Sequence, residues 1–260
     1  MHKKTALQAI YGETGRFPLF IDIVTNLLKY WSRLCKQPVD SLLYISLMEN
    51  IKIGKGSWSS SIFHLLDCLG LDKFKDPRTT SVEEIPILNI KKTLKTHYQN
   101  SWAENLKSGN GKGLENSKLR TYYLFKTEHY KEPYLDFVKK KCQHRTALAR
   151  FRTSSHKLEI EIGRYHNIDK DKRICKLCNS RELEEEIHMF SVCSAFDNSR
   201  SKLFNYLSTS CIQFPLLNNR EKFIWAMSNP SPEICITIAK YIYECFESRE
   251  SLLKSQSEKD

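Results

Sequence analysis

The chain has 260 residues, of which 40% are hydrophobic and 27% are charged, with 9 Gly and 8 Pro. This composition excludes a disordered tail and a fibrous protein, and the length allows one large domain or two smaller ones. The formal net charge of +11, from 41 Lys and Arg against 30 Asp and Glu, favours a polyanionic partner without specifying which one.

The amino-terminal sequence and the cysteine content favour a reducing compartment. The chain starts with MHKK and a mixed stretch in place of an apolar secretory segment, so we expect its 9 cysteines to be thiols. The best apolar run, residues 234–246, is interrupted by Lys240 and Glu244 and is shorter than the roughly 18 residues a membrane helix needs. We therefore expect an intracellular protein, in the nucleus or the cytoplasm, that does not span a membrane.

The first part of the chain has helical periodicity. Apolar side chains recur at a spacing of three or four, with breaks at Pro, Gly and Ser. The pattern predicts helices over residues 18–35, 41–51, 57–69 and 87–106. Residues 74–85, around Asp76 and Pro77, read as a turn. Residues 1–107 are thus predicted to form a helical region.

The later part is predicted as short helices around a cysteine-rich segment. The sequence SGNGKG at 108–113 indicates a loop, and residues 108–144 a connector. Short helices are predicted over 119–127, 134–141 and 146–152, a short strand over 158–162, and further helices from Ser194 and over 232–253. We expect a mainly α fold, with a basic and metal-binding segment at 145–207 and C-terminal helices at 208–260.

Cys175, Cys178, His188 and Cys193 follow the pattern C-x2-C-x9-H-x4-C. Three thiolates and one imidazole fill the tetrahedral shell of a Zn²⁺ ion and leave no position for a catalytic water, which predicts a structural site. The other cysteines have no comparable spacing, although ordinary buried thiols remain the alternative. On one continuous helix His188 and Cys193 would diverge by about 140°, so the chain is expected to turn between them.

Acidic residues precede this histidine. Glu182, Glu184, Glu185 and Glu186 are expected at a helix N-terminus, either on a solvated face or orienting the imidazole.

The segment before the cysteines is basic. Residues 139–173 contain eleven Lys or Arg and four acids, a balance of 11 − 4 = +7. We predict nucleic-acid contacts there, with the rings of Phe151, Tyr165 and His166 available to stack on unpaired bases. The alternative is a solvated face with Phe151 in the core. The candidate binding residues are Arg145, Arg150, Arg152, Lys157, Arg164, Lys172 and Arg173.

Three segments carry a family resemblance: residues 11–19 (YGETGRFPL), residues 148–165 (LARFRTSSHKLEIEIGRY) and the cysteine-rich region. Together they resemble the part of LINE-like non-LTR retrotransposon polyproteins that follows the reverse transcriptase. The resemblance covers nearly the whole chain and is strongest over residues 145–200. It implies that the cysteine-histidine module contacts element RNA or target DNA during target-primed reverse transcription.

The polymerase itself is not expected. The chain has no Tyr-x-Asp-Asp motif, and His129, His144, His156 and His166 have no nucleophile at a motif spacing, so we expect no enzyme activity. The glycines at 109, 111 and 113 lack the strand and hydroxyl of a phosphate-binding loop. The competing hypothesis is a zinc-stabilised helical scaffold that binds a protein partner and has no direct role with nucleic acid.

Overall fold

The computed structural model describes residues 5–109, 111, 113–137 and 142–258. In this part of the chain the regular structure is helical, and the β structure consists of two isolated bridges, so the predicted mainly α class is confirmed. None of the described helices is long and apolar enough to cross a membrane.

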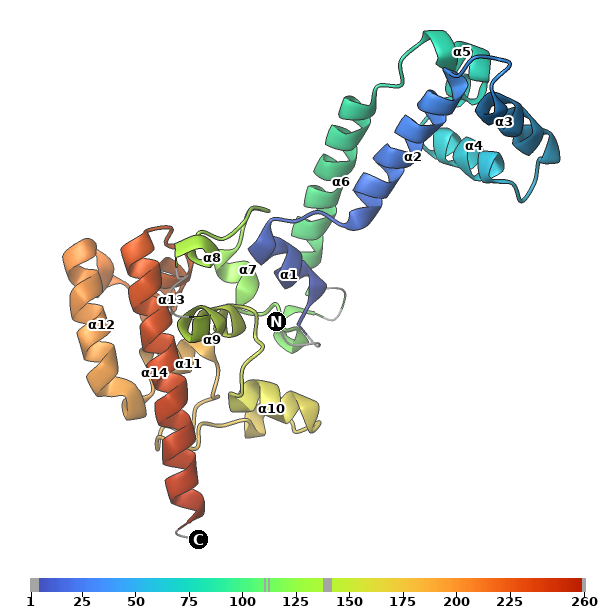
Figure 1. The fold of residues 1–260 in the computed structure, drawn as a ribbon. Helices are drawn as coiled ribbons and strands as arrows, with labels where there is room; N and C mark the ends of the chain where they lie inside the picture. Colours follow the sequence, from blue (N-terminus) through green and yellow to red (C-terminus); the bar gives the residue numbers. More distant parts are fainter. Residues whose placement is uncertain (1–4, 110, 112, 138–141, 259–260) are drawn as a thin grey trace. The chain divides into compact units, whose positions relative to one another are not determined.

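The chain divides into two units (Figure 1). We call Phe17–Ser101 the inserted unit, and residues 5–16 together with 102–258 the main unit. This division differs from the four predicted segments, because α1 (Leu7–Thr14) packs with later parts of the chain. Trp102 Nε1 donates a hydrogen bond to the carbonyl of Gln8 at 2.8 Å, and Glu13 binds Arg152.

Helices of the inserted unit surround one apolar core. They are α2 (Leu19–Cys35), α3 (Leu42–Ile53), α4 (Trp58–Cys68), α5 (Pro77–Val82) and the first part of α6 (Ile87–Lys107). Trp31 is fully buried, and its Nε1 donates to the carbonyl of Phe74 at 2.8 Å. The expected turn around Asp76 is a short helix, because the Asp76 carboxylate caps it and Pro77 takes its first position.

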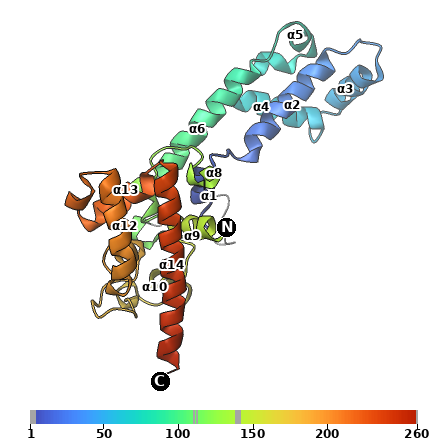
Figure 2. The same cartoon turned by 60° about the vertical axis from the view of Figure 1, so that its left-hand side comes forward.

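The main unit contains the remaining helices. They are α1, the end of α6, α7 (Tyr122–Phe125), α8 (Tyr134–Phe137), α9 (Cys142–Arg152), α10 (Glu159–Tyr165), α11 (Glu186–Ser191), α12 (Asp197–Ser210), α13 (Asn219–Ser228) and α14 (Pro232–Ser257). Both α9 and α12 pack against the long α14, which Figures 1 and 2 show from two sides.

Aromatic rings form the centre of the main unit. Phe223 lies 5.9–6.0 Å, between ring centroids, from Phe125, Phe151 and Phe190. These rings come from α7, α9, α11 and α13, so the core joins the cysteine-rich region to the rest of the unit.

The predicted strand at 158–162 is wrong. Residues Glu159–Tyr165 form α10, and both Leu158, which precedes the helix, and Ile160, within it, are fully buried. Alternating apolar residues over so few positions fit a strand or a short helix equally well, and tertiary packing selected the helix.

Candidate metal centre and basic surface

A short hairpin presents the first two cysteines. The backbone N–H of Cys175 donates to the carbonyl of Glu182 at 2.9 Å, and that of Glu184 donates to Arg173 at 3.0 Å. Arg181, with a φ of 58°, lies in the turn that returns the chain. Cys178 lies within this turn, so its sulfur and that of Cys175 approach one point.

The other two candidate ligands lie on either side of a helix end. His188 belongs to α11, which ends at Ser191, and Cys193 precedes the next helical turn. The backbone N–H of Cys193 donates to the carbonyl of His188 at 2.8 Å. The chain therefore turns between these two residues, as predicted, and both side chains reach the hairpin.

The cluster has the dimensions of a tetrahedral metal site. The four ligand atoms of Cys175, Cys178, His188 and Cys193 lie within 4.8 Å of one another. Cys175 Sγ is 3.8 Å from Cys193 Sγ, and Cys178 Sγ is 3.4 Å from His188 Nε2. With Zn–S bonds of about 2.3 Å and Zn–N bonds of about 2.0–2.1 Å, a tetrahedral ion separates two sulfurs by about 3.8 Å and sulfur from nitrogen by about 3.6 Å. The donor set and its spacing therefore fit a structural ion.

The short distances between the four side chains shift the pKa values of Cys175, Cys193 and the histidine. The hydrogen bond between Cys175 and Cys193 lowers the pKa of Cys175 to about 3 and raises that of Cys193 far above its usual range. Burial lowers the pKa of His188, but hydrogen bonds to Cys175 and Glu182 outweigh it and raise this pKa to about 9. A divalent cation at the centre would replace the protons, because metal ligands bind in their deprotonated forms.

Glu182 orients the imidazole. Its Oε2 lies 2.9 Å from His188 Nδ1, which leaves Nε2 directed at Cys178. Such a carboxylate fixes the ring orientation and tautomer of a metal-binding histidine. For Glu182, the expectation that an acidic residue orients the imidazole therefore agrees with the structure.

The expectation of a solvated face is wrong for Glu184 and Glu186, because both side chains are buried. The two Glu184 oxygens accept hydrogen bonds from Arg249 of α14 at 2.6 and 2.7 Å. Glu186 pairs with Arg120 at 2.6 Å and also accepts from Ser154 at 2.7 Å and His156 at 2.8 Å. Burial raises the pKa of Glu186, but Arg120 and His156 more than compensate and hold it well below its usual range.

These carboxylates bind the hairpin that carries Cys175 and Cys178 to the rest of the main unit. Along the extended segment 182–186, every second side chain points to a different partner: His188, Arg249 and then Arg120. Glu182, Glu184 and Glu186 stand at alternate positions, which matches the period of an extended segment, although Glu185 interrupts this pattern in the sequence. The partners Arg120 and Arg249 lie too far along the chain to be found by motif spacing.

Arg152 must be removed from the predicted nucleic-acid surface. Its side chain is 3% exposed and binds Glu13 through Nε and Nη2 and Glu132 through Nη2, the latter at 2.7 Å. A guanidinium enclosed by two carboxylates has no face left for phosphate.

The other predicted cations differ in availability. Arg150 and Lys157 are exposed, and Lys172 is exposed but pairs with Asp169 at 2.7 Å. Arg145 is half-buried beside Cys142. Arg164 is mostly covered, with one hydrogen bond to the carbonyl of Ser117 and an ion pair to Glu161. Arg173 donates to the carbonyls of Ile160 and Ile168. Lys139, Lys140 and Lys141 lie outside the described residues.

The three rings predicted to stack on bases also differ in their exposure to solvent. Phe151 is fully buried in the aromatic core, so the alternative that places this ring in the core is correct. Tyr165 is 41% exposed, and His166 is exposed. Only the last two are thus at the surface.

Comparison with known proteins gives no further assignment, since no family model, no curated protein and no solved structure matches this chain.

Proposed function

We propose that the main unit is a zinc-stabilised nucleic-acid-binding module, the C-terminal part of a LINE-like retrotransposon protein that lacks the polymerase. The observation that carries the proposal is the cluster of three cysteines and one histidine at tetrahedral spacing, next to a basic segment with exposed cations. Zinc is the ion proposed, because it prefers this set of sulfur and nitrogen donors. The protein would work inside the cell, in the nucleus or the cytoplasm, where its thiols stay reduced.

Zinc would have a structural role. It would hold Cys175, Cys178, His188 and Cys193, and so keep the hairpin folded against α11. Ordering of such a segment by zinc is worth about 10–16 kcal/mol in small modules. The Arg249 and Arg120 pairs then transmit this order to α14 and to the segment before α7.

Phosphate contacts would come from the exposed side chains Arg150 and Lys157, and Arg145 and Lys172 belong to the same basic segment. Each cation that neutralises a phosphate releases counterions, so affinity falls steeply with salt. The partner is element RNA or target DNA.

The experiment that tests this function is binding of RNA and DNA across a salt series. We expect the double variant Arg150→Ala/Lys157→Ala to lower the log-log salt slope by roughly 1.8, about 0.9 for each lost duplex contact. The matched control is Lys202→Ala/Lys240→Ala, which removes the same charge from exposed positions on α12 and α14. Equal slopes for all three proteins, with folding intact by circular dichroism, would contradict the surface.

One observation favours a second function, a protein-binding scaffold. The inserted unit exposes large apolar side chains on two helices: Leu19, Phe20 and Ile23 on α2, and Leu42, Leu43 and Ile45 on α3. Exposed apolar patches of this kind mark protein–protein contacts. A partner retained after nuclease treatment and lost with Leu19→Ser/Ile23→Ser would support the scaffold.

A further inference from the structure

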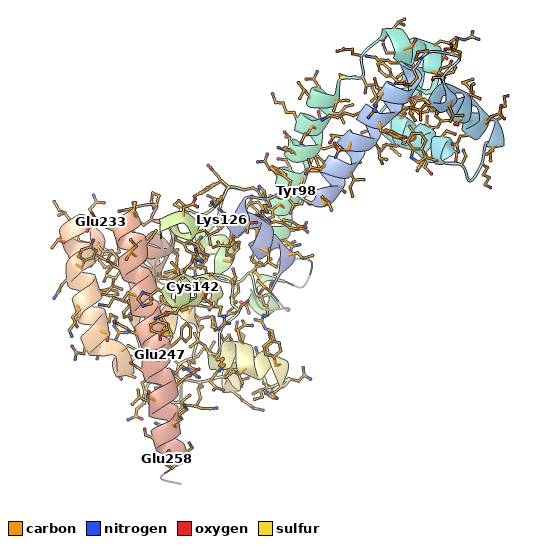
Figure 3. All side chains as sticks on the ribbon, in the orientation of Figure 1. Tyr98, Lys126, Cys142, Glu233, Glu247 and Glu258 are labelled. Atoms are coloured by element: carbon orange, nitrogen blue, oxygen red, sulfur yellow. The ribbon has the colours of Figure 1, made fainter. Side chains whose placement is uncertain are left out.

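A cavity of about 560 Å³ opens in the main unit between α9, α10 and α14. Its size falls within the range of about 300–1,000 Å³ typical of small-ligand pockets. The exposed cations Arg150 and Lys157 both line it, so the cavity belongs to the surface proposed above. Figure 3 labels Cys142, at the start of α9, and Glu247, on α14, which lie on two of its walls.

The apolar part of the lining contains aliphatic and aromatic side chains. Ala147, Ile162 and Phe246 contribute apolar surface, and Tyr165 and Tyr243 contribute rings with a polar edge. Tyr165 is held in place by Lys118, whose Nζ donates to its hydroxyl at 2.9 Å. Such a lining accepts a flat, partly apolar group.

His156 makes this lining rigid. Its Nδ1 accepts the backbone N–H of Leu158 at 3.3 Å, so the ring donates from Nε2 to Glu186 at 2.8 Å. The imidazole stacks on Phe246, with the ring planes 29° apart. The Glu186 carboxylate thus connects the wall of this cavity to the helix that carries His188.

The charged part of the lining has two sides. Arg150 and Lys157 supply cations from α9 and the turn after it, whereas Glu247 and Glu250 supply carboxylates from α14. Lys157 lies 3.2 Å from Glu250, but both side chains are at least half exposed, and such a pair is weak enough to open for a ligand. The third cation, Arg249, is committed to Glu184.

We propose that this cavity binds one unpaired ribonucleotide of a single-stranded RNA. The rings accept the base, Arg150 and Lys157 accept the flanking phosphate, and the Glu247 carboxylate accepts a hydrogen bond from the ribose 2′-hydroxyl. The three chemistries of a ribonucleotide, a flat base, an anion and a hydroxyl donor, match the three kinds of side chain in the lining. This inference rests on the proposed nucleic-acid function and adds a preference for RNA over DNA.

The test compares a short single-stranded RNA with the DNA of the same sequence, using the full chain loaded with zinc. We expect Tyr243→Ala to weaken binding of both strands by about 5–100-fold, because stacking does not depend on the sugar. We expect Glu247→Gln to bring the ratio of RNA affinity to DNA affinity down to about one, because the neutral amide accepts the 2′-hydroxyl hydrogen bond less well, whereas its loss of charge acts on both strands alike. Glu244→Gln, an exposed carboxylate on α14 outside the cavity, is the matched control, which removes the same charge and should leave the ratio of RNA affinity to DNA affinity unchanged.

The outcomes separate the two proposals. Wild-type protein that binds neither strand would overturn the nucleic-acid function and this inference with it. If nucleic-acid binding is salt-sensitive, but Tyr243→Ala does not weaken it and Glu247→Gln does not change the ratio of RNA affinity to DNA affinity, the inference alone is overturned. Circular dichroism and zinc content of each variant show whether a loss of affinity reflects a loss of folding.

Discussion

Glu13 and Arg152, 139 residues apart in sequence, form a buried ion pair, with Arg152 Nη2 2.9 Å from Glu13 Oε1 and Nε 3.0 Å from Oε2. Glu13 also accepts a hydrogen bond from the Tyr134 hydroxyl at 2.6 Å. Glu13 lies near the end of α1, and Arg152 is the last residue of α9. Their pairing joins α1 to α9, and Glu186, which binds Ser154 and His156, brings the cysteine-rich region to the same helix end.

We expect Arg152→Ala to lower the free energy of unfolding by about 3–5 kcal/mol, because it leaves the buried Glu13 carboxylate without an opposite charge. Glu13→Ala should lower it by less, since Glu132 still pairs with Arg152. The double variant should lose less than the sum of the two. Denaturant unfolding measures all three, and Arg150→Ala, on the exposed face of α9, should stay within about 0.5 kcal/mol of wild type. Additive losses would contradict a direct pair.

The purified protein should contain one zinc ion per chain, and Cys175→Ser/Cys178→Ser should contain none. The reason is that the four ligand atoms share a single site. Elemental analysis measures the content, and a chelator should lower the melting temperature of wild type only. The control Cys68→Ser/Cys142→Ser removes two exposed thiols and should retain the metal. Full zinc content in the Cys175 variant would reject this site.

Glu182→Gln should weaken zinc binding about 10–100-fold while preserving the stoichiometry, because the neutral amide orients and polarises His188 less well. Competition with a chromophoric chelator measures this affinity. Glu233→Gln, an exposed carboxylate at the start of α14, serves as the control. An affinity equal to that of wild type would show that the 2.9 Å contact does not act on the metal.

Gly12→Ala should destabilise the main unit by about 1–3 kcal/mol through overpacking. An added Cβ would lie 2.5 Å from the Tyr122 hydroxyl and 2.8 Å from Trp102, and both rings are buried. Tyr122→Phe removes the closer atom and should restore part of the loss in the double variant. Thermal unfolding of the four proteins measures this, and no recovery would assign the strain to Trp102 alone.

Cys35 should react with thiol reagents only after unfolding. Burial, with a smaller contribution from Asp76, raises the pKa of its thiol to about 12, so neither access nor thiolate is available at neutral pH. Exposed Cys68 and Cys142 should react at once. Mass spectrometry of the labelled protein measures the order, and early labelling of Cys35 would indicate local opening of the inserted unit.

Local patterns determined most of the helices and the candidate metal-binding cluster. Apolar side chains at helical spacing predicted α2, α4 and α6 closely, because amphipathic periodicity acts over neighbouring turns. The cysteine and histidine spacing identified all four candidate ligands, because metal chemistry restricts residue type and distance along the chain.

Tertiary structure alone decided which charges face solvent. In the sequence Arg150 and Arg152 are equivalent basic residues, yet one is exposed and the other is enclosed by Glu13 and Glu132. The same holds for Glu184 and Glu186, whose partners Arg249 and Arg120 lie more than sixty residues away. A buried charge persists only where an opposite charge meets it, and that meeting depends on how distant helices pack.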